Sequence, residues 1–335
     1  MNKKTKISVA VITYNQEDTI RQTLDSILMQ KGDFDLELVI GEDCSKDHTW
    51  DICNEYATKY PDIVRLLPNT HNLGITANYF RVLQACTGEY IADISGDDYY
   101  CDDYALAKQE AFLQHHLEVG FMGARGYEYF VKKKIKTPTL NREITLETDN
   151  SKQFYFSTAY KGGVYVRPVG DMMRRDILRY IDFDEIIRRH LPVEDYPMQA
   201  IFAQHCHFAC LPDLLVVYRI YDTSSTFVPV THPHYLSINK GLMDTRRYLN
   251  ELFPQDACFS EEWMQDYEFY KEFLLYLHKW QYKKAKDLLA HAAQTKAAGQ
   301  PHYMQAKRMT RSWLRFIAFA IYKELMYIKD IKNRT

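Results

Sequence analysis

Residues 7–18 read ISVAVITYNQED, an apolar run that passes directly into polar residues. The run at residues 7–13 is rich in β-branched side chains, which favour strands. Beyond the polar residues, four apolar side chains recur at the spacing of one helical face: Ile20, Leu24, Ile27 and Leu28. We therefore predict that the chain begins with a β-strand followed by an amphipathic helix.

The same cycle of strand and helix repeats through about the first hundred residues. Later strands are predicted at residues 36–40, 63–67 and 90–94, and helices at residues 47–59 and 76–87. This alternation implies an α/β fold with a mainly parallel sheet and flanking helices. In such sheets, ligands bind beyond the carboxyl ends of the strands.

Polar clusters follow three of the predicted strands. They are Thr13-Tyr14-Asn15 with Glu17, Glu42-Asp43-Cys44-Ser45, and Ser95-Gly96-Asp97-Asp98. The sequence has no G-x-G-x-x-G and no G-x-x-x-x-G-K-[ST] motif that could hold phosphates. Asp97 and Asp98 are then either turn formers or ligands for Mg²⁺ or Mn²⁺, and such an ion could bind a diphosphate.

Four segments in this order resemble the nucleotide-sugar-binding half of family 2 glycosyltransferases: ISVAVITYNQED, GEDCSKDHT, NLGITAN and GEYIADISGDD. The resemblance covers about the first 120 residues, and VEDYPMQ with LLVVYRIYDTSST extends it to about residue 225. It implies the GT-A fold. It also implies transfer of a sugar from a nucleotide diphosphate donor, with inversion at the anomeric carbon.

The resemblance assigns the residues of the first clusters to the donor nucleotide. Thr13 and Glu17 correspond to residues near the base, with Tyr14 and Asn15 in the same substrate-binding cluster. Asp43 corresponds to the acidic residue that contacts the base, usually uracil. Asn78 corresponds to a polar position on the helix after the third strand.

The third cluster resembles the D-x-D motif of the family. Asp97 corresponds to its metal-coordinating residue, and Asp98 to the acidic residue that often follows. Ser95 stands where relatives have the first Asp, which reaches the ribose. A serine hydroxyl can still form a hydrogen bond there but adds no charge. The implied cofactor is Mg²⁺ or Mn²⁺.

Glu194 and Asp195 supply the second half of the expected chemistry. An acceptor hydroxyl must lose a proton as it attacks, and inversion places the base opposite the departing diphosphate. In the family the second residue of this acidic pair is the base, so Asp195 is assigned that role. The alternative is a helix start, where acidic residues and Pro197 are favoured, and both roles are compatible.

Arg219 follows Tyr218 in a segment that in the family lies near the active site. Relatives carry a histidine two residues later, where this chain has Tyr221. Arg219 could donate to the diphosphate, or it could pair with a carboxylate of the core. The sequence leaves both roles open.

The composition restricts the class of protein and its location. Lys and Arg number 42 and Asp and Glu number 44, which does not suggest a nucleic-acid partner. Seven scattered cysteines fit a reducing, cytoplasmic compartment, and the short N-terminal apolar run fits a strand better than a signal peptide. No run reaches the about 20 apolar residues of a membrane span. The set His205, Cys206, His207 and Cys210 lacks the usual zinc spacing and fits a helix-to-strand junction better.

From about residue 231 the pattern becomes helical throughout. We predict a catalytic domain at residues 1–230 and a helical region at residues 231–335, with helices at 236–253, 261–278, 282–298 and 305–331. The last helix contains the apolar aromatic run WLRFIAFAIY between basic residues. It could lie at the inner face of the cell membrane, or it could pack on the other helices or on a second copy of the chain.

These patterns together predict a metal-dependent inverting glycosyltransferase. The expected donor is a UDP-sugar, and the expected acceptor is a growing surface glycan or its lipid-linked precursor. One alternative is an inactive protein that binds nucleotide sugars or acts as a scaffold. A second is a nucleotidyltransferase, although the acidic TYNQED segment does not suit its phosphate-gripping loop.

Overall fold

The computed structural model describes residues 4–141, 166–221, 230, 232–257, 259–295 and 297–334. The chain divides into two compact units, Met1–Ser224 and Ser225–Thr335, close to the boundary predicted at residue 230. The end of the LLVVYRIYDTSST segment, residues 222–226, lies outside the described residues.

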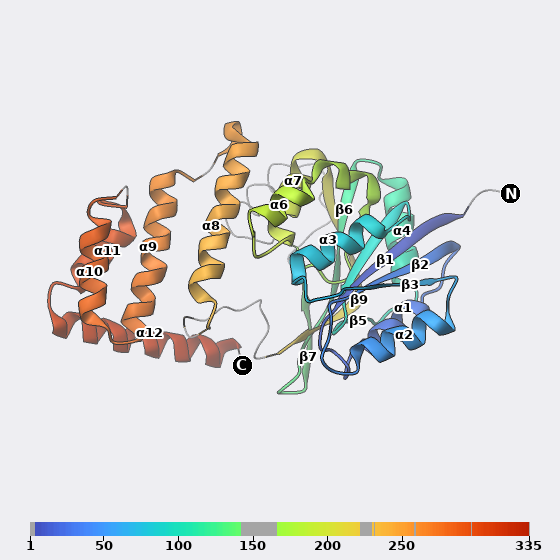
Figure 1. The fold of residues 1–335 in the computed structure, drawn as a ribbon, viewed down its shortest axis with the longest axis horizontal. Coiled ribbons are helices and arrows are strands. Elements are labelled where there is room, and N and C mark those ends of the chain that lie inside the picture. Colours follow the sequence, from blue (N-terminus) through green and yellow to red (C-terminus); the bar gives the residue numbers. More distant parts are fainter. Residues whose placement is uncertain are drawn as a thin grey trace. The chain divides into compact units, whose positions relative to one another are not determined.

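The first unit is built on a nine-stranded sheet with the order β3-β2-β1-β4-β8-β6-β9-β5, and β7 pairs with β6 (Figure 1). The strands are β1 (Thr5–Thr13), β2 (Phe34–Glu42), β3 (Val64–Pro68), β4 (Tyr90–Ser95), β5 (Tyr99–Tyr100), β6 (Val119–Phe130), β7 (Ile135–Leu140), β8 (Met172–Arg174) and β9 (His207–Ile220). Strands β1 to β4 are parallel, whereas β8 is antiparallel to β4. The predicted α/β class with a mainly parallel sheet is confirmed.

Helices connect the parallel strands and cover the sheet on both faces (Figure 1). They are α1 (Ile20–Leu28), α2 (Thr49–Lys59), α3 (Ile75–Ala85), α4 (Ala105–His115), the 3₁₀ helix η1 (Arg175–Tyr180), α6 (Phe183–Arg188) and α7 (Asp195–His205). Each of the strands and helices predicted up to residue 94 is present, with ends shifted by at most a few residues. The predicted junction is also confirmed, because α7 ends at His205 and β9 begins at His207.

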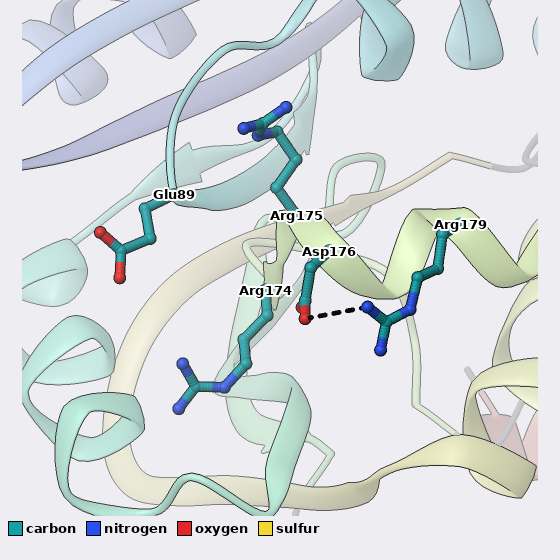
Figure 2. A pocket seen from close by; sticks show the side chains of 5 residues that line it. All are labelled: Glu89, Arg174, Arg175, Asp176 and Arg179. Atoms are coloured by element: carbon teal, nitrogen blue, oxygen red, sulfur yellow. Dashed lines mark ion pairs between the residues drawn. The ribbon is translucent and has the colours of Figure 1, made fainter.

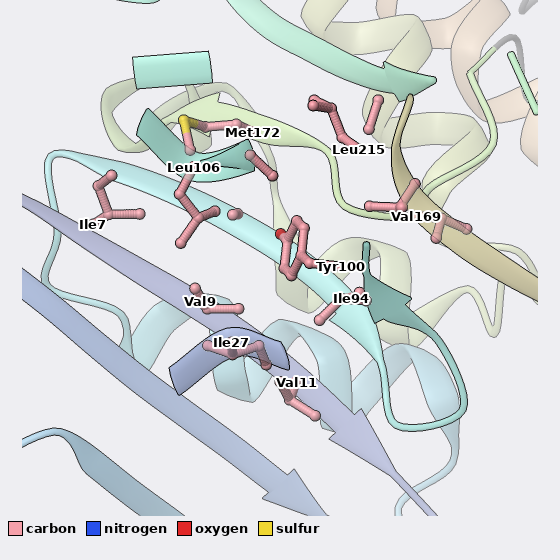
Figure 3. Close-up of a cluster of buried hydrophobic side chains, with 14 of the residues drawn as sticks. Ile7, Val9, Val11, Ile27, Ile94, Tyr100, Leu106, Val169, Met172 and Leu215 are labelled. Atoms are coloured by element: carbon pink, nitrogen blue, oxygen red, sulfur yellow. The ribbon is translucent and has the colours of Figure 1, made fainter. Parts of the chain in front are cut away.

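The main core of this unit lies between the central strands and the helices that cover them. Figure 3 shows part of it, where Val9 and Val11 of β1 lie near Ile27 of α1 and Ile94 of β4. All four side chains are at most 2% exposed. This centre holds the carboxyl ends of β1, β2 and β4 in position, and the three predicted polar clusters lie at these ends and on the loops that follow them.

The second unit is helical, as predicted. It contains α8 (Tyr235–Leu252), the short 3₁₀ helix η2 (Pro254–Asp256), α9 (Glu261–His278), α10 (Tyr282–Ala292), α11 (Pro301–Met309) and α12 (Trp313–Arg334). The single helix predicted at residues 305–331 is wrong, because two helices, α11 and α12, cover this segment. The last helical hydrogen bond of α11 is donated by the Thr310 amide to the Ala306 carbonyl, and the Ser312 hydroxyl accepts from the Arg315 amide at the start of α12.

Candidate active site

Gly96 fixes how the turn after β4 lies against the turn after β1. A Cβ atom at Gly96 would lie 2.5 Å from Gln16 Oε1 and 2.7 Å from Thr13 Oγ1. The Gly96 carbonyl accepts hydrogen bonds of 3.0 Å from the hydroxyls of Thr19 and Thr23. No larger residue fits this contact without displacing the turn, so the absence of a side chain brings Thr13 and the Asp97 turn together.

The loops after β1 and β2 are joined by two of the predicted residues. Asn15 adopts a positive φ of 52°, and its Oδ1 accepts from the Lys46 amide at 2.8 Å. Glu17 Oε2 accepts from the His48 amide at 2.9 Å, beside the start of α2. Tyr14 between them is 39% exposed. Asn15 and Glu17 therefore shape the loop pair, while Tyr14 presents an aromatic ring to solvent at the same edge.

Asp43 is buried, and the neighbouring loop occupies its carboxylate. Its Oδ1 accepts from the Leu73 amide at 2.7 Å and from Asn69 Nδ2 at 2.8 Å, and its Oδ2 accepts from the Gly74 amide at 2.9 Å. Asn78 is also buried and donates to the Gly41 carbonyl at 2.8 Å. Both residues hold the segment that leads into α3, and their contact with a donor base stays a prediction.

The two carboxyl groups of the Asp97–Asp98 turn have different surroundings. Asp98 is 1% exposed, and its Oδ1 accepts from the Arg219 amide at 2.7 Å. Asp97 is half-buried, and burial raises its pKa while the nearby Arg219 and Gln16 lower it. Asp98 thus ties the turn to β9, which leaves Asp97 as the carboxyl group that can face a ligand. Ser95, at the end of β4, is likewise half-buried.

The Arg219 guanidinium holds the Asp97–Asp98 turn through a hydrogen bond. It donates to the Asp97 carbonyl and to Gln22 Oε1, and it lies 4.7 Å from the centre of the Tyr99 ring. Only 8% of Arg219 is exposed. These contacts favour the holding role over contact with a diphosphate, which stays a prediction.

Glu194 and Asp195 lie at the start of α7. Glu194 Oε2 accepts from the Thr76 hydroxyl at 3.2 Å, so this acidic pair meets the first turn of α3. Asp195 Oδ1 is buried and has no hydrogen-bond partner among the described residues. Burial raises the pKa of Asp195 well above its ordinary value, and the carboxyl groups of Glu194 and Asp93 raise it further.

Two further carboxyl groups lie beside Asp195 and were missed in the sequence. Asp93 lies on β4 and Asp171 precedes β8, and the Asp93 amide donates to the Asp171 carbonyl at 3.0 Å. Asp171 is fully buried and Asp93 nearly so, and Tyr79 donates its hydroxyl to Asp93 Oδ2 at 2.6 Å. Burial raises the pKa of both carboxyl groups. The carboxylates of Asp93 and Asp195 raise the pKa of Asp171 further. A carboxyl group inside the apolar strand YIADIS was a signal for Asp93; nothing in the sequence pairs it with Asp171.

No group of three or more His, Cys, Asp or Glu side chains is arranged around a metal position in the described part of the chain. A divalent ion at Asp97 would thus have few protein ligands. This suits an ion that completes its shell with diphosphate and water oxygens, as Mg²⁺ commonly does.

A cavity of about 560 Å³ lies at the opposite end of β4, lined by Glu89, Arg174, Arg175, Asp176 and Arg179 (Figure 2). Arg174 donates to the carbonyls of Leu113, His116 and Val119, which end or follow α4. Its guanidinium is thus bound within the fold. None of the predicted site residues lines this cavity.

Residues 8–181 match the family model described as Glycosyl transferase family 2. The chain belongs to this family. An uncharacterized protein of Mycobacterium tuberculosis is 32% identical to this chain over 217 residues, 64% of this chain. The match spans 58% of that relative's length. EpsE of Bacillus subtilis, named provisionally as a glycosyltransferase, is 37% identical over 37% of this chain and 44% of its own.

Solved structures share the fold of this family 2 chain. Residues 1–349 of TarS from S. aureus, in complex with UDP-GlcNAc, align with a TM-score of 0.52 at 19% identity, covering 90% of this chain and 79% of that one. The mannosyltransferase PcManGT from Pyrobaculum calidifontis, in complex with GDP-Man and Mn²⁺, aligns with a TM-score of 0.52 at 19% identity. That alignment covers 97% of this chain and 88% of PcManGT. The predicted GT-A fold is confirmed.

Proposed function

We propose that this protein transfers a sugar from a UDP-sugar to an acceptor hydroxyl with inversion of the anomeric configuration. The observation that carries the proposal is Asp195: a buried carboxyl oxygen without a described partner at the start of α7, in a carboxyl group whose pKa is raised by burial, by Glu194 and by Asp93 of β4. The turn that follows the same strand holds Asp97. The proposed base and the proposed anchor for the diphosphate thus come from different segments of the chain.

Asp195 would remove the proton from the acceptor hydroxyl. The acceptor oxygen then forms a bond to the anomeric carbon as the bond from that carbon to the diphosphate oxygen breaks. The proton moves to the Asp195 carboxylate, and the negative charge leaves on the UDP. A base works best when its pKa lies close to the working pH, so the raised pKa of Asp195 makes its carboxylate a stronger base than an exposed Asp.

Asp97 is the residue that would hold Mg²⁺ or Mn²⁺. Such an ion, when bound, supplies positive charge that stabilises the departing diphosphate. The Mn²⁺ in the PcManGT complex and the UDP-GlcNAc in the TarS complex support a metal and a UDP-sugar for this chain. Ser95 and Tyr14 are the remaining side chains that could reach the ribose and the base.

We place the reaction in the synthesis of a surface polysaccharide or glycolipid, on the cytoplasmic side of the membrane. The glycosyltransferase name of EpsE and the TarS structures support sugar transfer in general. The acceptor would be a growing glycan or its lipid-linked precursor.

The proposal can be tested with purified protein and a panel of UDP- and GDP-sugars in Mn²⁺. We expect one UDP-sugar to raise the melting temperature and to be hydrolysed slowly, with release of UDP, in the absence of acceptor. Chelation of the metal should stop the hydrolysis. Donor binding without any UDP release, with or without glycan acceptors, would indicate a binding protein instead. Release of pyrophosphate from a nucleoside triphosphate would indicate a nucleotidyltransferase.

A further inference from the structure

Charge is distributed very unevenly along this chain. Residues 279–335 contain 13 Lys and Arg but only 3 Asp and Glu, although acidic residues slightly outnumber basic ones in the whole chain. Residues 301–323, which form α11 and the first half of α12, contain five basic residues and no acidic one: Lys307, Arg308, Arg311, Arg315 and Lys323. Four of these are exposed and Lys323 is half-buried. This part of the helical unit therefore has a strongly positive surface.

In residues 313–323 of α12, the part whose side chains are described, some apolar side chains are buried and others are exposed. Phe316 and Ala320 are 1% and 2% exposed and belong to the core of the helical unit. Leu314 and Ile321 are 74% and 47% exposed. Residues 314, 317 and 321 follow the i, i+3, i+7 spacing, so they form one stripe that is turned away from Phe316 and Ala320. Trp313 and Tyr322, next to this stripe, are 58% and 53% exposed.

An apolar stripe beside aromatic and basic side chains matches the composition of helices that lie in a membrane interface. There the apolar side chains enter the acyl region, Trp and Tyr lie at headgroup level, and Lys and Arg meet anionic lipid. Among the helices of the described residues, none is long and apolar enough to cross a membrane.

We propose that the surface formed by α11 and the first half of α12 binds an anionic lipid bilayer, with Leu314 and Ile321 inserted and Arg311 and Arg315 at the headgroups. This inference goes beyond the proposed function, because it concerns a surface outside the unit that carries the site. A second copy of the chain fits the same surface less well, since a symmetric contact would bring the basic residues of both copies together without acidic partners.

Co-sedimentation of the full-length protein with vesicles tests the proposal. We expect binding to phosphatidylcholine vesicles with about 30% phosphatidylglycerol, and binding at least about tenfold weaker to phosphatidylcholine alone. Raising the salt from about 0.02 M to about 0.5 M should weaken binding strongly, because the charges are exposed. Equal binding to both kinds of vesicle, or no binding to either, would overturn the proposal.

Matched variants identify the surface. Leu314→Gln with Ile321→Gln should lower the partition to anionic vesicles at least about tenfold, because two apolar side chains no longer enter the bilayer. Leu117→Gln is the control, since Leu117 is 77% exposed but lies in the other unit. Arg311→Gln with Arg315→Gln should lower the partition about tenfold or more.

Two further measurements separate the outcomes. Far-UV circular dichroism and UDP-sugar hydrolysis should be the same in wild type and variants, so that a loss of vesicle binding is not a loss of folding or of the active site. If the Leu314 and Ile321 variant instead converts a dimer to a monomer in light scattering and leaves vesicle binding unchanged, the surface is an interface between copies and the proposal is wrong.

Discussion

Two sets of buried carboxyl groups in the first unit differ in how their oxygens are used. Asp43 and Asp98 are both nearly inaccessible, and backbone amides donate to their carboxylates. Asp171 and Asp195 have buried carboxyl oxygens without hydrogen-bond partners among the residues described. Buried polar groups are normally hydrogen-bonded, so the first set stabilises the fold and the second set costs stability. A buried carboxyl group that lowers the stability of the fold is therefore the stronger indication of chemistry.

The largest expected effect is at Asp195. Asp195→Asn keeps the size of the side chain but removes the base, so sugar transfer should fall at least about 100-fold while UDP binding stays nearly unchanged. Because the carboxyl group must be ionised to act, wild-type transfer should rise with pH through a pKa above the usual range of Asp. The measurement is initial-rate kinetics across pH, with calorimetry for UDP.

Glu194→Gln is the matched variant, because Glu194 is the adjacent carboxyl group and already accepts a hydrogen bond from Thr76. It should keep transfer within about tenfold of wild type. If Asp195→Asn keeps transfer within a factor of about three and Glu194→Gln does not, the base is Glu194.

Asp43 should give the next largest effect, on stability. Asp43→Ala leaves the amides of Leu73 and Gly74 without their acceptor, and a hydrogen bond to a charged group contributes about 1.5–3 kcal/mol. We expect the free energy of unfolding to fall by about 2 kcal/mol or more, measured by urea titration. Asp35→Ala, at an exposed position of the same strand β2, should change it by less than about 0.5 kcal/mol. If Asp43→Ala and Asp35→Ala lower the free energy of unfolding equally, Asp43 does not have the structural role assigned to it.

Asp97 should affect ligand binding more than folding. Asp97→Ala removes the carboxyl group assigned to the metal, so UDP affinity in Mn²⁺ should fall about tenfold, equivalent to about 1.4 kcal/mol. Without metal, wild type and variant should bind UDP equally weakly. Calorimetry that finds the same UDP affinity for the wild type in Mn²⁺ and in chelator would remove the metal from the proposed mechanism.

The smallest expected effect is a gain of stability at Asp171. The folded state holds a proton on this carboxyl group at pH values where the unfolded state has lost it, so its contribution to stability falls as pH rises above about 4. Asp171→Asn removes this loss of stability and should raise the melting temperature at pH 7 but not at pH 4. Thermal unfolding at both pH values checks this, with exposed Asp176→Asn as the control. A destabilised variant at pH 7 would show that the carboxylate has a favourable partner.

The sequence predicted the parallel strands and the loops after them because the apolar runs and helical spacing are local signals. Asp97 and Asp195 could be found in the same way, since each stands beside a recognisable segment. Asp171 could not, because its neighbour Asp93 is 78 residues away and the antiparallel pairing of β8 with β4 leaves no periodic pattern. The break between α11 and α12 was missed because no Gly or Pro marks it: the hydrogen bonds of α11 run up to the Thr310 amide, and Ser312 already caps the start of α12.

The segment from α7 to Arg219 connects the proposed base, Asp195, to the turn that carries the proposed metal ligand, Asp97. Asp195 begins α7, β9 starts directly after that helix, and the Arg219 amide near the end of β9 holds Asp98. Pairing of Val216 and Val217 with Tyr100 and Tyr99 sets the register of this end. One residue added between Val217 and Arg219 would displace the amide by about 3.3 Å, more than a hydrogen bond tolerates. The number of residues in β9 therefore helps to set the spacing between Asp195 and the Asp97–Asp98 turn. Substitutions along this strand should be tolerated far better than insertions or deletions in it.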